Sequence, residues 1–162
     1  MKKFELTTEF ITNMFGKKLF RIKALVEFGN VKAGELGGYV EKEENVSQDG
    51  NAWVSGDAEV SGDARVSGNA EVSGNAWVSG NARVSSDADY ALVQGFGTEF
   101  RCTTFYRGKN KKIMVNCGCF HGDLEGFRKQ VKETRNGKIA KEYLMIADLM
   151  EYHFTSEDSS NE

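Results

Sequence analysis

Apolar and polar positions recur with a period of six along the middle of the chain. The units between Asn51 and Leu92 read NAWVSG, DAEVSG, DARVSG, NAEVSG, NAWVSG, NARVSS and DADYAL. Ala and Val stand two apart in each unit, as in Ala58 and Val60, so both side chains point to one side of a strand and the residue between them points outward. The Gly and Asn or Asp that follow favour a tight bend, because they tolerate positive φ. The pattern predicts a short strand and a corner in every unit.

A strand that bends every six residues cannot pair with itself, so each turn of the chain must pair with the turns above and below it. Three such sides close a triangle of eighteen residues. In that register the outward side chains stack in three pairs: Trp53 over Glu71, Glu59 over Trp77, and Arg65 over Arg83.

The hexads resemble the hexapeptide-repeat left-handed β-helix family, whose pattern has an aliphatic residue first and a small residue fifth, as in the segment from Val54 to Glu59. The left hand is implied by this resemblance alone. The predicted fold class is mainly β with a small α+β end: a short left-handed parallel β-helix of about three coils, with an N-terminal β cap and a C-terminal ββαα module.

Four segments are predicted from the patterning: an N-terminal β cap over 1–35, the hexapeptide β-helix over 36–94, the ββαα module over 95–154, and a disordered acidic tail over 155–162. In the module, strands over 100–106 and 112–120 are joined by a basic turn. Asp123 can cap the first helix, whose Leu124, Phe127 and Val131 share a face, and a second helix runs over about 138–154.

Charge is segregated along the chain. The net charge of −3 combines basic flanks with acidic hexads and an acidic tail, because residues 1–35 carry +3, residues 36–94 carry −7, residues 95–154 carry +4 and residues 155–162 carry −3. There is no apolar run of membrane-spanning length and no signal-like start, so we expect no membrane partner. The odd set of Cys102, Cys117 and Cys119 suits a reducing cytoplasm.

Nearly the whole chain resembles uncharacterised β-helix proteins carried by bacteriophages and prophages. The resemblance rests on the opening from Leu19 to Leu25, on the segment from Gly34 to Asn45, on the hexads, and on the junction from Cys119 to Gly122. It implies a viral accessory protein that works in the cytoplasm of an infected bacterium, and it brings no catalytic residues.

One candidate ligand site lies where the last strand meets the first helix. The free amides of a helix start attract anions, and basic residues lie in neighbouring segments. The pattern predicts a site for a phosphate-bearing small ligand formed by Arg107, Lys109, Lys112, His121, Gly122 and Arg128. The alternative is that Asp123 alone caps this helix and satisfies its amides.

The outward residues of the hexads suggest an interface. Trp53, Arg65, Trp77 and Arg83 would lie on flat faces, where exposed Trp is costly unless it is covered and stacked Arg residues repel. We therefore expect a homo-oligomer, and the β-helix resemblance implies a trimer. The alternative is that these residues are solvated singly.

Enzymatic chemistry finds little support in the sequence. Hexapeptide acyltransferases use a His base and protruding loops, and residues 36–94 contain no His. Cys117, Cys119 and His121 alternate and could hold zinc or form a nucleophile and base, but their spacing is not that of ordinary zinc ligands. We predict no enzyme, no metal and no cofactor, and the metal question for these three residues stays open.

The predicted function is binding. The phage resemblance favours a host-defence antagonist that sequesters a nucleotide-like immune signal or blocks a defence protein, and no nucleic-acid duplex is expected as a partner. Two alternatives remain: a structural scaffold whose flat faces carry the function without a ligand, and a degenerate hexapeptide acyltransferase.

Overall fold

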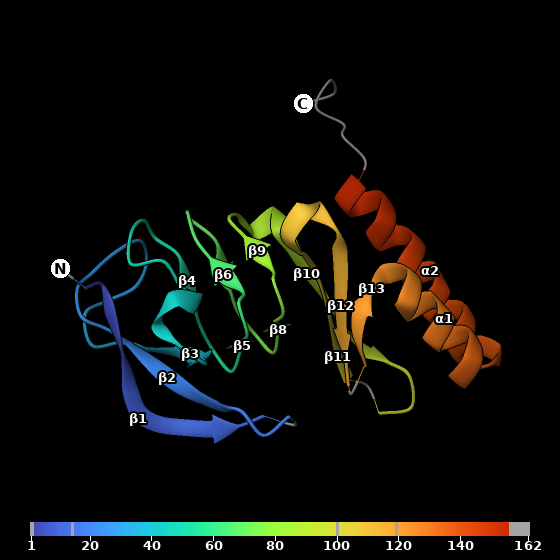
Figure 1. Cartoon of the computed structure of the whole chain (residues 1–162), viewed down its shortest axis with the longest axis horizontal. Coiled ribbons are helices and arrows are strands. Elements are labelled where there is room, and N and C mark those ends of the chain that lie inside the picture. Colours follow the sequence, from blue (N-terminus) through green and yellow to red (C-terminus); the bar gives the residue numbers. More distant parts are fainter. Residues whose placement is uncertain (1, 14, 100, 119, 156–162) are drawn as a thin grey trace.

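The chain runs from an N-terminal β-hairpin through a row of very short strands to an antiparallel sheet covered by helices (Figure 1). The structure, a computed structural model, describes residues 2–13, 15–99, 101–118 and 120–155. The strands and α-helices are β1 (Phe4–Thr12), β2 (Lys18–Ala24), β3 (Leu36–Val40), β4 (Trp53–Val54), β5 (Glu59–Val60), β6 (Arg65–Val66), β7 (Glu71–Val72), β8 (Trp77–Val78), β9 (Arg83–Val84), β10 (Tyr90–Phe96), β11 (Arg101–Arg107), β12 (Ile113–Cys117), β13 (Phe120–Asp123), α1 (Leu124–Thr134) and α2 (Gly137–Thr155).

The predicted fold class is wrong: a short left-handed parallel β-helix with a β cap and a ββαα module does not describe the molecule. The strands fall into separate sheets of five, four, two and two strands. The largest, in the order β1-β2-β3-β5-β8, joins antiparallel pairs to parallel ones. The hexads form strands of only two residues, while the longer flanking strands pair as antiparallel hairpins and extend the sheets. The described residues therefore form no regular parallel coil.

The register predicted between the hexads is confirmed locally. Trp53 lies opposite Glu71, and Val60 lies opposite Val78, in parallel pairs. The Ala and Val of each unit are at most 1% exposed from Ala52 to Val84 and fill one hydrophobic core. Corner glycines adopt positive φ; at Gly68 (φ 62) a Cβ would also lie 2.6 Å from the Ser85 carbonyl oxygen. The six-residue period of the sequence thus determines which residues of the hexads pair and which are buried.

The C-terminal sheet has four strands, in the order β10-β11-β12-β13, where two were predicted. The last hexad does not continue the row: β10 starts at Tyr90 and pairs antiparallel with β11. The predicted strand over 112–120 is divided at Gly118 (φ 58), after which β13 runs back along β12. Both changes follow from turns that let the chain form hairpins.

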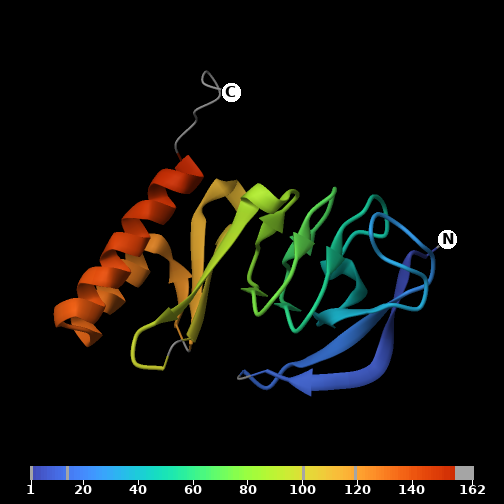
Figure 2. The same cartoon turned by 180° about the vertical axis from the view of Figure 1, so that it is seen from behind.

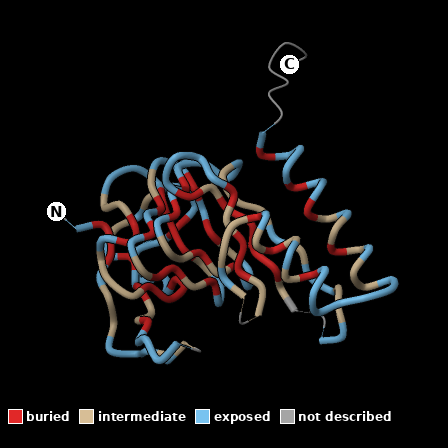
Figure 3. The backbone as a smooth tube through the Cα atoms, turned by 45° about the vertical axis from the view of Figure 1, so that its right-hand side comes forward, coloured by how far each residue is buried: buried red, intermediate tan, exposed pale blue. Residues whose placement is uncertain are grey.

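The two helices cover one face of this sheet, on the side away from the hexads (Figure 2). Asp123 caps α1 as predicted, with its side chain accepting a hydrogen bond from the Gly126 amide, and Leu124, Phe127 and Val131 are buried. A second core forms between helices and sheet (Figure 3). No helix in the described part of the chain is long and apolar enough to cross a membrane. The predicted acidic tail, apart from Thr155 at the end of α2, lies outside the described residues.

Candidate functional site

Two buried side chains attach the C-terminal sheet to the hexads. The Trp77 amide donates a hydrogen bond to Thr104 Oγ1 (2.9 Å), and Asn116 Nδ2 donates to the Trp77 carbonyl (2.8 Å) and to Ser79 Oγ (3.0 Å). Thr104 and Asn116 are each 1% exposed. The free edge of β8, whose peptide groups need partners, is therefore closed by side chains instead of by another strand.

His121 supports this junction from the neighbouring strand. It lies opposite Asn116 in the β12–β13 pair, and its Nδ1 contacts Asn116 Oδ1. Burial lowers the pKa of His121, because desolvation disfavours the charged imidazolium. His121 was predicted as a ligand contact. In the structure it lies where its side chain orients Asn116.

Two of the predicted anion-binding cations are paired with carboxylates. Arg107 Nε lies 2.9 Å from Asp89 Oδ1, and its guanidinium lies over the Phe154 ring. Lys112 Nζ lies 3.0 Å from Asp123 Oδ2. The pKa of Asp123 is lowered, first by the hydrogen bond from the Gly126 amide and then by Lys112. Local acidic groups thus already neutralise these charges.

Arg128 is surrounded even more closely by acidic groups. Its Nη2 lies 2.8 Å from Asp148 Oδ1 and 2.6 Å from Glu151 Oε1, and its Nη1 contacts Glu125. These contacts join α1 to α2. The cluster therefore carries more negative than positive charge.

The remaining members of the predicted set are apart from these pairs. Lys109 is exposed in a short 3-10 turn (Lys109–Lys111), and Gly122 lies opposite Val115, where a Cβ would meet the Phe120 ring at 2.9 Å. The structure does not bring the six residues together around one hollow. An anion site built from them stays a prediction.

The cysteine and histidine candidates are separated by the turn at Gly118. His121 faces Asn116, and Cys117 is the residue next to Asn116, so their side chains project to opposite faces of the sheet. Thr103 Oγ1 donates a hydrogen bond to Cys117 Sγ (3.1 Å). Cys119 lies outside the described residues, and the rest of the described chain contains no group of three His, Cys, Asp or Glu residues that could hold a metal.

The two tryptophans of the predicted interface are covered by the chain itself. Trp53 is 1% exposed and packs edge-on against Phe28 and Phe4, with ring centroids 5.2 and 6.2 Å away. Trp77 is half-buried, with its ring 5.7 Å from that of Phe15 in the β1–β2 turn. Strands β1 and β2 fold back along the hexads, and so these rings have intramolecular cover.

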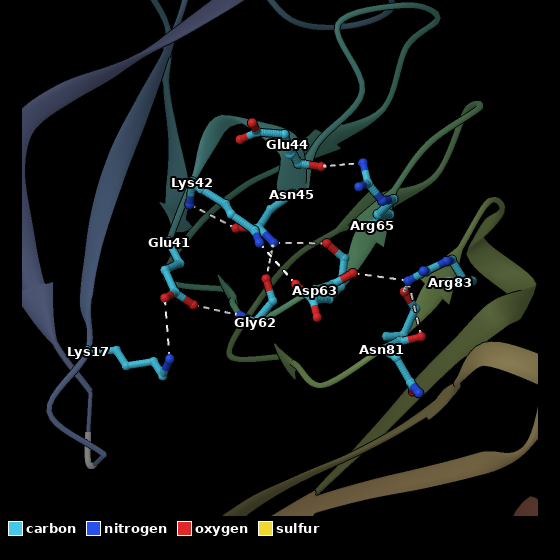
Figure 4. Close-up of polar contacts among 12 residues, drawn as sticks. Lys17, Glu41, Lys42, Glu44, Asn45, Gly62, Asp63, Arg65, Asn81 and Arg83 are labelled. Atoms are coloured by element: carbon cyan, nitrogen blue, oxygen red, sulfur yellow. Dashed lines mark hydrogen bonds and ion pairs between the residues drawn. The ribbon is translucent and has the colours of Figure 1, made fainter.

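The two arginines of that predicted interface are exposed and lie on adjacent parallel strands (Figure 4). Arg83 Nη1 donates to the Asp63 carbonyl (3.0 Å) and to two further backbone carbonyls, and Arg65 Nη1 donates to the Glu44 carbonyl (3.4 Å). Lys42 Nζ lies 3.0 Å from Asp63 Oδ1. Backbone oxygens and Asp63 thus compensate the stacked guanidinium groups without an outside partner.

A cleft of about 260 Å³ lies beside the second core, between the β10–β11 loop, the end of β12 and both helices. A smaller hollow of about 50 Å³ shares several of its walls. The lining residues are Phe96, Gly97, Thr98, Glu99, Cys117, Gln130, Thr134, Arg135 and Tyr143, and Phe120, Phe127 and Val131 line the smaller part.

Arg135 distinguishes this cleft from the basic hairpin, which is the β11–β12 pair and its turn with Arg107, Lys109 and Lys112. Arg135 is the C-cap of α1, its backbone N–H bonds the Val131 carbonyl, and its exposed side chain forms no ion pair with a described residue. Aromatic walls and polar groups such as those of Gln130 and Thr134 surround it. Aromatic side chains together with a few convergent polar groups are typical of a small-molecule site. Sequence reasoning missed it because its parts come from four separate segments.

No protein-family model matches the chain. No curated protein matches it either.

Proposed function

We propose that the protein is a phage-type accessory protein that acts by binding, as a host-defence antagonist that sequesters a nucleotide-like signal or blocks a defence protein. The cleft beside Arg135 is the observation that supports sequestration. An unpaired guanidinium suits a phosphate group, and the neighbouring aromatic rings suit a planar base.

The site of the proposed ligand is the cleft and not the basic hairpin. At the hairpin a phosphate would have to displace Asp123 from Lys112 and Asp89 from Arg107. At the cleft it would meet Arg135, whose exposed side chain forms no ion pair with a described residue. Desolvating paired charges is costly, so the cleft is the better anion site.

Calorimetric titration with cyclic and adenine-containing nucleotides tests this proposal. We expect saturable binding that weakens at least tenfold in Arg135→Ala, since a charge-assisted hydrogen bond to phosphate is lost, about 1.5–3 kcal/mol. Lys132→Ala, an exposed change on the same helix, is the matched control and should bind normally.

The alternative site is tested in the same experiment. Lys112→Ala should leave binding unchanged if the ligand occupies the cleft. Loss of heat in Lys112→Ala but not in Arg135→Ala would move the ligand to the basic hairpin, and no heat with any nucleotide would remove the sequestration proposal. Acetyl coenzyme A belongs in the same panel, because its binding would favour the acyltransferase alternative.

A scaffold without a ligand is the second candidate function. The observation that favours it is a row of exposed apolar side chains on α2, where Met145, Leu149 and Tyr152 are 61%, 59% and 67% exposed. Such a row is typical of a surface that is covered by another protein.

A further inference from the structure

The outer side of α2 carries an apolar stripe opposite the side that packs on the sheet. Tyr143, Ala147, Met150 and Phe154 are buried, whereas Met145, Leu149 and Tyr152 follow one another at intervals of four and three residues and are exposed. This spacing places the exposed three on one face of a helix. The helices form one end of the elongated molecule, so the stripe lies open at that end (Figures 1 and 2).

Charge along this end is polarised. The outer side of α2 is basic near its start, where Lys138 and Lys141 are exposed. Near its finish, Asp148 and Glu151 join Glu125 around the single guanidinium of Arg128, which leaves excess negative charge. The helix dipole has the same sense, positive at the start of α2 and negative at its finish, so it adds to this polarisation.

We propose that this stripe joins two copies of the chain, with their α2 helices antiparallel. An antiparallel arrangement places the basic start of each helix beside the acidic finish of the other, and also opposes the two helix dipoles. A parallel arrangement would place Lys138 and Lys141 beside the same residues of the second copy. Charge complementarity therefore selects a second copy in the antiparallel sense, with a two-fold axis near the middle of the stripe.

This surface differs from the hexapeptide faces and from the cleft. Trp53 and Trp77 are covered by the chain's own N-terminal residues, and Arg65 and Arg83 bond to backbone oxygens. A trimer was implied only by the β-helix resemblance, whose fold class is wrong here. The α2 stripe leaves the hexapeptide faces free and forms a pair.

Sedimentation velocity over a range of protein concentrations tests the pairing. We expect the unmodified chain to be a dimer at high concentration, and Leu149→Glu to be a monomer throughout the range, at least tenfold weaker in association. The matched control is Leu36→Glu, which makes the same substitution at a leucine of β3 that is 50% exposed and lies outside the C-terminal helices. Leu36→Glu should dimerise like the unmodified chain.

Circular dichroism of each variant shows whether it is folded, and Tyr152→Lys gives a second variant for the same face. A monomeric unmodified chain at all concentrations would overturn the proposal. A dimer that survives in both folded α2 variants would also overturn it, because association would then use another face.

Discussion

At the residue scale, Lys3 is the most unusual charged group in the described chain. Its side chain is buried, with Nζ 2.7 Å from the Ala52 carbonyl, 3.3 Å from the Gly50 carbonyl and 4.5 Å from the centre of the Phe28 ring. Burial lowers its pKa from 10.5 to about 8, against a smaller opposing effect of Asp49. The amine thus fastens the N-terminus to the first hexad through backbone oxygens.

This lowered pKa predicts a rise in stability with pH. Between about 8 and 10.5 the unfolded chain binds a proton at Lys3 that the folded chain has lost, so the free energy of unfolding should increase through this window and show the full penalty below it. Lys3→Met removes the titrating group. Urea denaturation from pH 7 to 10 should show the unmodified chain gaining stability relative to Lys3→Met, and a constant difference would contradict the assignment.

At the element scale, the junction between β8 and the C-terminal sheet depends on Asn116. Its amide bonds two groups of the hexapeptide segment and contacts His121. Asn116→Ala leaves the part-buried Trp77 carbonyl without this donor, and we expect a loss of about 2–4 kcal/mol from the unpaired group and the lost bonds. Urea denaturation of the unmodified chain and of Asn116→Ala measures this loss in the free energy of unfolding.

Asn110→Ala is not a suitable control for that loss, because Asn110 has positive φ. Lys129→Ala is better, since Lys129 is exposed on α1 and its loss should cost under about 0.5 kcal/mol. Equal effects of the Asn116 and Lys129 changes would show that the junction does not depend on the amide.

Local patterning predicts some elements of this protein and not others. The pairing of Val60 with Val78 and the cap at Asp123 follow from short-range rules, period and capping, and both are present. The turn at Gly118 that divides β12 from β13 was missed, because the run from 112 to 120 is apolar enough to read as one strand. The order of the sheets was missed for a related reason: pairing between distant strands is decided by tertiary contacts that a local pattern does not contain.

The candidate site was harder to predict than the fold. Basic residues such as Arg107 and Lys112 attract attention in the sequence, but their carboxylate partners, Asp89 and Asp123, are found only once the chain is folded. Arg135 stands in an ordinary helix connection, and its significance depends on the walls that other segments supply. An unpaired charge beside a hollow is a property of the tertiary structure.

At the scale of the whole molecule, the hexads lie between the N-terminal hairpin and the C-terminal sheet. The hairpin covers one side of them through Phe4 and Phe15, and the C-terminal sheet closes the edge of β8 through Thr104. The cleft and the α2 stripe both belong to the C-terminal region, the first beside the α1–α2 connection and the second on the outer side of α2. A ligand and a second copy can therefore be bound by one region without competing for the same residues.

The most direct test of binding without turnover is mass spectrometry of the small molecules released by denaturing protein purified from bacterial lysate. We expect a phosphate-bearing molecule, recovered in near-equal proportion to the unmodified chain and with the mass it has in the lysate, and its absence from Arg135→Ala purified in parallel. Recovery of a chemically altered product, or of the same amount from both proteins, would contradict it.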